Sequence, residues 1–397
     1  MTDTGEERHT RGRGQTKRLT DRELFESRRF SGTAYITVDR DSFTDGELLI
    51  AAETVRSGGL CVFPTETVYG IGADATDSRA AEKIYRAKGR PSDNPLIIHV
   101  SSPSETERYA VTCPLYYRLA SQFMPGPLTV IMPRRGTIPK TVTGGLETVA
   151  VRCPSHPVAN ALIRLAGVPI AAPSANISGR PSATSAEFAL RDFAGRADVI
   201  IDGGDADFGL ESTIVRITGD DSVELLRPGA VTRDALLCVC GEVTVSPGAA
   251  GELPADERPV CPGMKYRHYA PSKPLALVRG DMKSRTAFFA EQAKRGGIII
   301  CYDEQLPQIG GEAISLGSEK DLLSQGHLLF SALRRADTLP GDRIFANMPP
   351  VEEDEGGLGL ALYNRLIRAA AHTVVNAGPA GSAPDGPGRA ANIHTLE

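Results

Sequence analysis

The chain has 397 residues, which is more than one hydrophobic core usually organises, so its length favours two domains with room for a linker or a tail. With 41% hydrophobic and 23% charged residues, it contains enough apolar material for packed globular domains. These values exclude a collagen-like protein and a wholly disordered one.

No run of about 18 uncharged apolar residues occurs, and the N-terminus lacks the positive stretch and apolar core of a secretion signal. We therefore expect a cytoplasmic protein without a membrane partner. The seven cysteines are odd in number and never spaced as CxxC, so the sequence suggests neither a disulfide framework nor a protein-bound metal.

The net charge of −5 is unevenly distributed. Residues 1–30 contain eight Lys or Arg against six Asp or Glu, a local charge of +2, which leaves −7 for the remainder. An acidic body argues against a protein that coats nucleic acid, although weak RNA binding in a local basic cleft stays open.

Residues 1–44 are polar and basic without an apolar period and are predicted to be a flexible extension. An α/β domain with a mixed sheet is predicted over 45–240, because strand and helix patterns alternate there. It begins with a helix from Asp45, which Gly58 and Gly59 end. Further helices are expected at 80–87, 115–123 and 158–166, and strands at 60–63, 96–100, 128–132, 148–152, 168–172, 199–202 and 213–217.

The second half divides into three parts. Residues 241–273 have the Pro, Gly and Ala content of a linker, and residues 377–397 are predicted to be a disordered tail. Between them, residues 274–376 predict a small α/β domain with a parallel sheet. Its strands are expected at 275–278 and 298–302 and its helices at 283–295, 321–336 and 358–374.

The stretch that begins with Lys88 and Arg90 offers two cations to an oligophosphate. Gly89 and Pro91 disfavour a helix there, and an extended backbone would point both cations to the same side. Asn94, in the turn that follows, adds an amide donor. For a lone Lys-x-Arg, a solvated basic turn is the ordinary alternative.

Two predicted strands carry polar side chains on one face. His99 alternates with Ile98, and Thr148, Ala150 and Arg152 share a face. A histidine suits a substrate hydroxyl or carboxylate, and an arginine suits a bidentate carboxylate. The structural alternatives are a satisfied core histidine and a surface ion pair.

A polar loop directly follows the strand at 168–172. Its Ser174, Asn176 and Ser182 suit contacts to phosphate and ribose, and ligand loops often lie at strand ends. The N-cap of a following helix would explain only the second half of this loop.

Two smaller motifs complete the candidates. Ser212 enters a predicted strand after Glu211, and Arg227 stands before Pro228 and Gly229. The sequence contains no GxxxxGK[ST] loop, no GxGxxG after a strand, no HExxH and no GxSxG elbow. A nucleotide site would therefore not be of those common kinds.

Together these motifs resemble the YrdC/YciO-type family and, within it, the long two-domain L-threonylcarbamoyladenylate synthases. The resemblance covers about residues 45–376. In the linker pattern, Cys261 stands where serine is usual. The motifs that carry the resemblance are Phe63–Gly70, Lys88–Pro95, Thr148–Arg152, Ser174–Asn176, Glu211–Thr213, Leu226–Gly229, the linker signature Pro262–Pro271 and the C-terminal Gly357–Leu366.

The resemblance implies a YrdC-like twisted mixed sheet with helices and a deep concave cleft, plus a smaller Rossmann-like α/β domain, with the linker closing over the active site. It implies a nucleotidyltransferase that uses ATP with Mg²⁺, L-threonine and bicarbonate to make threonylcarbamoyl-AMP and pyrophosphate. The product would pass to the tRNA threonylcarbamoyl transferase machinery, which modifies an adenosine beside the anticodon.

The resemblance also assigns roles, position by position. Lys88 and Arg90 become the catalytic cations. Threonine contacts fall on Thr67, His99, Arg152, Ala172 and Ser212. Contacts to the nucleotide or the carbamoyl group fall on Lys88, Arg90, Asn94, Thr148, Ser174, Asn176, Ser182, Arg227, Tyr266 and His268.

Two other functions fit the sequence less well. A double-stranded RNA or ribosome-associated binding protein of the same fold is disfavoured by the acidic body, and His99 and Ser212 would have no obvious use on an RNA surface. A carbamoyl-transfer relative in hydrogenase maturation would need zinc-finger cysteines and an acylphosphatase-like segment, which the sequence lacks.

Overall fold

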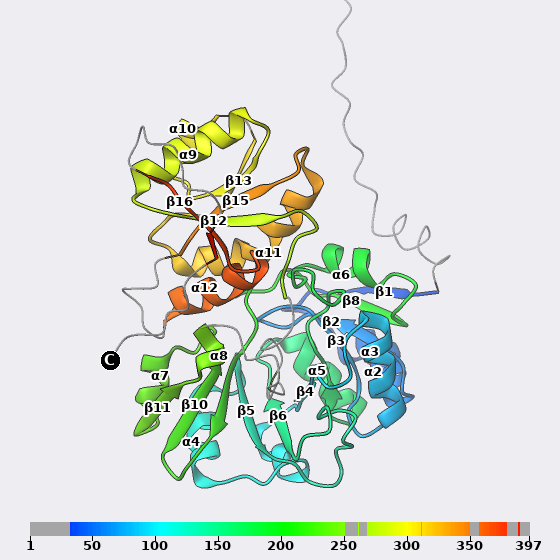
Figure 1. Ribbon diagram of the computed structural model, residues 1–397. Coiled ribbons are helices and arrows are strands. Elements are labelled where there is room, and N and C mark those ends of the chain that lie inside the picture. Colours follow the sequence, from blue (N-terminus) through cyan, green and yellow to red (C-terminus); the bar gives the residue numbers. More distant parts are fainter. Residues whose placement is uncertain are drawn as a thin grey trace, which may run out of the picture.

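The computed structural model describes residues 32–250, 261, 268–310, 312–349, 357–378 and 388–389. These residues form two α/β domains, each built on its own sheet (Figure 1). The predicted site residue Tyr266 lies outside the described residues.

The first domain contains a mixed sheet of eleven strands in the order β1-β8-β2-β3-β7-β4-β6-β5-β9-β10-β11. The sheet contains parallel pairs, such as β4 with β6, and antiparallel pairs, such as β5 with β6. The strands are β1 Ala34–Thr37, β2 Cys61–Phe63, β3 Gly70–Asp74, β4 Ile97–His99, β5 Leu128–Pro133, β6 Thr148–Arg152, β7 Ile170–Ala171, β8 Val199–Asp202, β9 Thr213–Ile217, β10 Ser222–Arg227 and β11 Glu242–Val245.

Helices cover this sheet and bury two large apolar cores, and a smaller third cluster lies around Ile97 and Ile214. Because side chains alternate along a strand, Val62 of β2 packs into one core while Cys61 and Phe63 pack into the other. The first core includes α3 Ser78–Lys88, α4 Pro114–Phe123 and α6 Ala186–Phe193, and the second includes α2 Asp45–Arg56 and α5 Pro157–Ala166. The short elements are η2 Pro103–Arg108, α7 Arg233–Leu237 and α8 Pro247–Ala250.

The sheet corrects both predicted boundaries of this domain. Residues 34–37 were expected in the flexible extension, but they form β1, which pairs in parallel with β8. Residues 242–245 were expected in the linker, but they form β11, which pairs with β10. The sheet strands therefore run from Ala34 to Val245 rather than within 45–240. Each of these short segments pairs its backbone N–H and C=O groups with those of a neighbouring strand, which stabilises it at the edge of the sheet.

The second domain has the predicted parallel sheet, in the order β14-β13-β15-β12-β16-β17, with only β17 antiparallel. Alternation again separates two cores, since Leu277 of β12 packs with α11 and α12 while Val278 packs with α9. The elements are β12 Leu275–Arg279, α9 Met282–Lys294, β13 Ile298–Cys301, α10 Leu306–Ile309, β14 Ala313–Ser315, α11 Leu322–Thr338, β15 Ile344–Asn347, α12 Leu358–Ala369, β16 Thr373–Asn376 and β17 Gly388–Arg389.

Two predictions fail at the end of this domain. The helix expected over 358–374 ends at Ala369, and Thr373–Asn376 is strand β16. Ala371 and His372 have positive φ values of 46° and 59°, so the chain turns sharply between helix and strand. The short strand β17 pairs with β16 inside the segment expected to be a disordered tail.

Helices α11 and α12 of the second domain face the first domain (Figure 1). Val68 and Leu210 of the first domain pack into the core formed by these helices. Gly209 has a φ of +68°, and a Cβ there would lie 2.6 Å from the carbonyl oxygen of Gly326 in α11. The two domains therefore approach each other as closely as backbone permits at this point.

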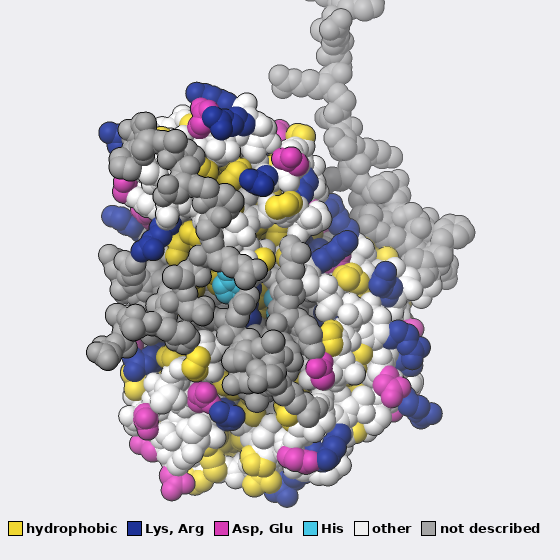
Figure 2. Space-filling model, viewed as in Figure 1, with side chains coloured by type: hydrophobic (Ala, Val, Ile, Leu, Met, Phe, Trp, Pro, Cys, Tyr) yellow, Lys and Arg dark blue, Asp and Glu magenta, His cyan; other side chains and the backbone are white. Residues whose placement is uncertain are grey.

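On the face shown in Figure 2, Lys and Arg (dark blue) are interspersed with Asp and Glu (magenta) over both domains rather than gathered in one patch. Among the described residues, no helix is both long and apolar enough to cross a membrane.

Candidate active site

One pocket in the first domain gathers most of the predicted site residues around a cavity of about 60 Å³. It is lined by loops at the ends of the central strands and by the linker residues His268 and Tyr269. The predicted residues that line it are Thr67, Lys88, Arg90, His99, Arg152, Ala172, Ser174, Asn176, Ser212, Arg227 and His268.

Lys88 and Arg90 both line the pocket, but the predicted backbone is wrong. Lys88 is the last residue of α3, and Gly89 caps that helix in the left-handed conformation with a φ of 62°. Glycine adopts this conformation without the steric cost of a Cβ. The turn at Gly89, rather than an extended strand, delivers both cations to the pocket.

The Lys88 ammonium is buried and is held by the polar loop. Its Nζ donates to the carbonyl oxygens of Ser174 and Asn176, which uses two of its three donor hydrogens. Burial, with the neighbouring Arg90 charge, lowers the pKa of Lys88 well below its usual value. The charges of Asp192 and Glu211 offset this effect only in part, so an anionic ligand would add further counter-charge.

Arg90 is half-buried and is fixed by the turn that follows it. Its Nη2 donates to the side-chain oxygen of Asn94 at 2.6 Å and to the carbonyl oxygen of Pro95 at 2.9 Å. Burial, with the charge of Arg227, lowers the pKa of Arg90 to about 10. Asn94 itself does not line the pocket, so the structure gives it the task of orienting Arg90.

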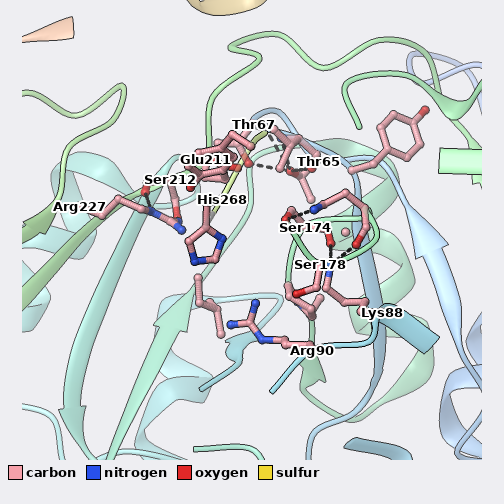
Figure 3. A pocket seen from close by; sticks show the side chains of 18 of the residues that line it. Thr65, Thr67, Lys88, Arg90, Ser174, Ser178, Glu211, Ser212, Arg227 and His268 are labelled. Atoms are coloured by element: carbon pink, nitrogen blue, oxygen red, sulfur yellow. Dashed lines mark hydrogen bonds between the residues drawn. The ribbon is translucent and has the colours of Figure 1, made fainter. Parts of the chain in front are cut away.

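Figure 3 shows Arg90 and Arg227 pointing toward the same space from opposite sides, with the His268 ring between them. The His268 Nε2 is buried without a hydrogen-bond partner. Burial, followed by the charges of Arg90, Arg368 and Arg227, lowers the pKa of His268 well below its usual value. His268 is therefore a neutral ring among cations.

The backbone beside His268 bridges the two domains. The Ala270 amide donates to the carbonyl oxygen of Gly179 at 2.8 Å. The Tyr269 ring stacks on Phe330 of α11 with centroids 5.2 Å apart. These contacts hold His268 between the polar loop and the second domain.

His99 ends β4 and is buried, as the structural alternative proposed, yet it also lines the pocket. Its Nδ1 lies 3.2 Å from the carbonyl oxygen of Ile170, which can only accept, so Nδ1 carries the hydrogen and Nε2 keeps a lone pair. Burial and the Arg152 charge lower the pKa of His99 to about 3. The ring is therefore neutral at physiological pH.

Arg152 lies at the end of β6, opposite His99 in the β4 register, and is also buried. Its Nη2 lies 2.8 Å from the Glu66 carboxylate. Burial alone would raise the pKa of Glu66, but Arg152 lowers it. The predicted surface ion pair is thus a buried one that borders the pocket.

Among the described residues, the Thr67 hydroxyl has one hydrogen-bond partner, the Thr65 hydroxyl. The Thr65 hydroxyl donates to the carbonyl oxygen of Val68 at 2.6 Å, so in its 2.9 Å contact with Thr67 it accepts. Thr67 therefore donates to Thr65 and can accept a hydrogen bond from a ligand.

The polar loop is held by its own side chains. Ser174 donates to the Asn176 side-chain oxygen at 2.6 Å, and the Asn176 amide donates to the carbonyl oxygens of Ile177 and Arg180, both at 2.9 Å. Asn176 therefore shapes the loop with its whole amide, while Ser174 keeps acceptor capacity toward the pocket. The following helix α6 is capped by Ser185, so the helix-entry alternative holds for the loop's end.

Ser212 and Arg227 contact each other directly. Arg227 donates through Nε to the carbonyl oxygen of Ser212 at 3.0 Å and through Nη2 to its hydroxyl at 3.1 Å. The Thr129 hydroxyl lies 2.7 Å from the same Ser212 hydroxyl. Both side chains are buried and line the pocket, Ser212 from the residue before β9 and Arg227 from the end of β10.

Glu211 lines the pocket, although the sequence reasoning gave its carboxylate no role. Ser182 does not line the pocket; its hydroxyl donates to Glu211 Oε1, so it supports the site from behind. The pocket also has lining residues that were not predicted, among them Thr65, Ser178 and Tyr269. Each lies one or two positions from a predicted residue.

Thr148 is not among the pocket-lining residues. It begins β6, whereas Arg152 ends it, and four strand steps separate them by roughly 13 Å. Sharing a strand face with Arg152 therefore does not bring Thr148 to the pocket.

Family models match both domains. Residues 53–229 match the model described as telomere recombination (Sua5, YciO and YrdC), and residues 231–371 match the model of the threonylcarbamoyl-AMP synthase C-terminal domain.

Full-length relatives give the same picture. The threonylcarbamoyl-AMP synthase of Pyrococcus abyssi is 42% identical over 85% of this chain and 97% of its own, and that of Bacillus subtilis is 41% identical over 85% and 96%. The crystal structure of P. abyssi Sua5 complexed with L-threonine is 40% identical, covers 87% of this chain and 99% of its own, and has a TM-score of 0.78. The chain therefore belongs to the family of threonylcarbamoyl-AMP synthases, in its long two-domain form.

Proposed function

We propose that this enzyme joins L-threonine, bicarbonate and ATP into threonylcarbamoyl-AMP and releases pyrophosphate. The product would supply the threonylcarbamoyl group to a tRNA transferase in the cytoplasm. The observation that carries the proposal is one pocket that combines three cations, Lys88, Arg90 and Arg227, with small hydroxyl groups and a neutral histidine. Such a pocket suits a polyphosphate beside a small polar amino acid.

The threonine end of the site is assigned to Thr67, His99, Arg152 and Ser212. An apolar pocket discriminates threonine from valine only about a hundredfold, so selection requires a partner for the hydroxyl. Thr67 and the neutral His99 can each accept that hydrogen bond. Arg152 has five donors, of which Glu66 engages part, and can take the substrate carboxylate as well.

The nucleotide end is assigned to Lys88, Arg90, Ser174 and Arg227. Arg90 and Arg227 face the same space, where they can offset triphosphate charge from two sides (Figure 3). The empty space in this pocket and at its mouth is about 700 Å³, which lies in the usual size range of ligand pockets.

The chemistry needs no covalent attachment to the protein. The threonine amine adds to bicarbonate with loss of water and forms a carbamate. A carbamate oxygen then bonds to the α-phosphorus while the bond to the pyrophosphate oxygen breaks. Positioning of the two reactants and neutralisation of the leaving group are the tasks left to the side chains.

Mg²⁺ is proposed to enter with ATP. Among the described residues, no group of three His, Cys, Asp or Glu is placed to hold a metal, and the pocket-lining Glu211 is paired with Arg365. Magnesium bound to a nucleotide is usually held by phosphate oxygens and water, with few protein ligands. The residues present fit that arrangement, in which bound Mg²⁺ would supply further neutralisation of phosphate charge while Lys88 and Arg90 contact the phosphates.

The test is to incubate the purified chain with ATP, labelled bicarbonate and threonine and to look for labelled threonylcarbamoyl-AMP and pyrophosphate. Omission of each substrate, and replacement of threonine by valine, are the controls. Product formation that requires all three substrates is expected. No product, together with tight binding of double-stranded RNA, would instead favour the RNA-binding alternative.

A further inference from the structure

Arg365 is a buried arginine of the second domain that ends against the pocket wall of the first. It lies on α12, and its side chain is 0% exposed. Its Nε lies 3.1 Å from Glu211 Oε2, and its Nη2 donates to the Glu211 carbonyl oxygen at 3.2 Å. Its Nη1 donates to the carbonyl oxygen of Pro228 at 2.5 Å. One guanidinium thus joins two separate segments of the first domain.

Those two segments carry the pocket residues Ser212 and Arg227, each next in sequence to a residue that Arg365 holds. The segments are packed without slack, because a Cβ on Gly229 would lie 2.6 Å from the Thr213 nitrogen and 2.9 Å from the Glu211 carbonyl oxygen. A shift of either segment would therefore change the two Arg227 to Ser212 hydrogen bonds of 3.0 and 3.1 Å.

The charge of Glu211 depends on the same arginine. Burial alone would raise the pKa of Glu211, but Arg365 and then Arg227 lower it. Without Arg365, the Glu211 carboxylate would keep the hydrogen bond from the Ser182 hydroxyl. Of the two arginines that lower its pKa, only Arg227 would remain. Attraction to Glu211 would then compete with the contacts that Arg227 makes to Ser212.

We propose that Arg365 is a positioning residue of the active site: from the second domain it holds Glu211 and Pro228, and so places Ser212 and Arg227 for the substrates. This inference rests on the proposed function, which assigns Ser212 to threonine and Arg227 to the nucleotide. The second domain therefore completes the substrate pocket rather than only packing beside it.

A matched control variant on the same helix distinguishes this positioning role from that of an ordinary interface contact. Asn364 donates to the carbonyl oxygen of Ala249, which is remote in sequence from both pocket segments. Arg365→Met and Asn364→Ala each remove an interdomain contact, but only the first touches the pocket wall. Arg365→Lys keeps the charge, yet a single ammonium cannot reproduce the planar fork that reaches three acceptors.

The experiment uses the full-length chain and compares wild type, Arg365→Met, Arg365→Lys, Glu211→Gln, the double variant Arg365→Met/Glu211→Gln, and Asn364→Ala. Thermal unfolding, the KM values for threonine and ATP, kcat, and calorimetric threonine binding are measured. We expect at least a tenfold rise of the threonine KM in Arg365→Met, little rescue by lysine, and less than a twofold change in Asn364→Ala.

The double variant tests the charge mechanism. The KM penalty of Arg365→Met should be at least threefold smaller in the Glu211→Gln background, because the neutral amide leaves no buried charge to pull on Arg227. Equal penalties in both backgrounds, an unchanged threonine KM, or an equal loss in Asn364→Ala would each overturn the inference.

The two proposals can fail separately. A wild-type chain that binds threonine but forms no threonylcarbamoyl-AMP overturns the proposed function, while calorimetry still decides the role of Arg365. A wild-type chain that neither binds threonine nor forms the product overturns both.

Discussion

The two cationic sides of the pocket are held in different ways. On the Lys88 side, formed by Lys88, Arg90 and Ser174, the hydrogen bonds of these side chains end on the first domain. The second domain contacts this side only further along the polar loop, where Arg334 of α11 donates to the carbonyl oxygens of Pro181 and Ser182. On the Arg227 side, formed by Glu211, Ser212 and Arg227, the segments are tied to Arg365 of the second domain. The comparison shows that the second domain contacts the Arg227 side next to its pocket residues, but the Lys88 side only at a distance along the polar loop.

The largest effect is expected on the Lys88 side. Arg90→Ala removes a cation whose contacts lie within one turn of chain, so pyrophosphate release should fall at least about a hundredfold, as when one charge-stabilising donor is lost. Circular dichroism and the thermal midpoint should stay close to wild type. Undiminished turnover in the folded variant would remove Arg90 from the mechanism.

Truncation after Val245 tests whether the Arg227 side needs the second domain. It removes Arg365 and leaves the first sheet complete through β11. We expect kcat/KM to fall at least as far as in Arg365→Met, about tenfold or more, while the first domain stays folded by circular dichroism. A fully active truncated chain would show that the Arg227 side needs no support.

Ser212→Ala tests the Arg227 side alone. It removes the hydroxyl that Arg227 Nη2 and Thr129 contact but keeps the backbone carbonyl that Arg227 Nε uses. A loss of about 1 kcal/mol, or roughly fivefold in the threonine KM, is expected with a smaller change in the ATP KM. An ATP KM that rises more than the threonine KM would place Ser212 at the nucleotide instead.

His99 tests a group whose contacts with Ile170 and Phe63 lie in the first domain, and its effect is on stability rather than on turnover. Its pKa of about 3 in the folded chain is below the unfolded value of about 6.5, so the unfolded chain binds the extra proton as pH falls below 6.5. Stability should then decrease by about 1.4 kcal/mol per pH unit from this group, and His99→Gln should remove that slope.

Urea unfolding at pH 7, 6 and 5 tests the His99 prediction in both the full and the truncated chain. His156, which is buried and whose pKa is lowered to about 4, should leave a remaining slope of the same sign in the variant. A slope unchanged by His99→Gln would contradict the assignment of a neutral, buried ring.

Much of the site was predictable from the sequence because short polar motifs follow strand patterns. The co-location of Lys88 and Arg90 was predicted, although through an extended backbone, since Lys88 at a helix end and Gly89 as its cap are compatible with the same spacing. The roles of Asn94 and Ser182 behind the pocket were not predictable, because a motif does not show which of its members faces inward.

The remaining features depend on contacts between distant positions. Strand β3 contains Gly70 and Gly72 and has little strand propensity, yet a Cβ on Gly72 would lie 2.5 Å from Ile170 Cγ2, so only glycine fits there. The pairing of Glu211 with Arg365 spans 154 positions, and no local pattern encodes it.

The contact of Gly209 with Gly326 constrains how this architecture can be recombined. A second domain taken from a relative would have to bring a helix whose backbone can lie against residue 209, since any side chain there meets the carbonyl oxygen of Gly326 and the Cα of His327, both at 2.6 Å. Leu210 and the Glu211 segment follow immediately. Chimeras that ignore this pair should therefore assemble with the wrong spacing, whereas grafts that carry both glycines keep the catalytic unit intact.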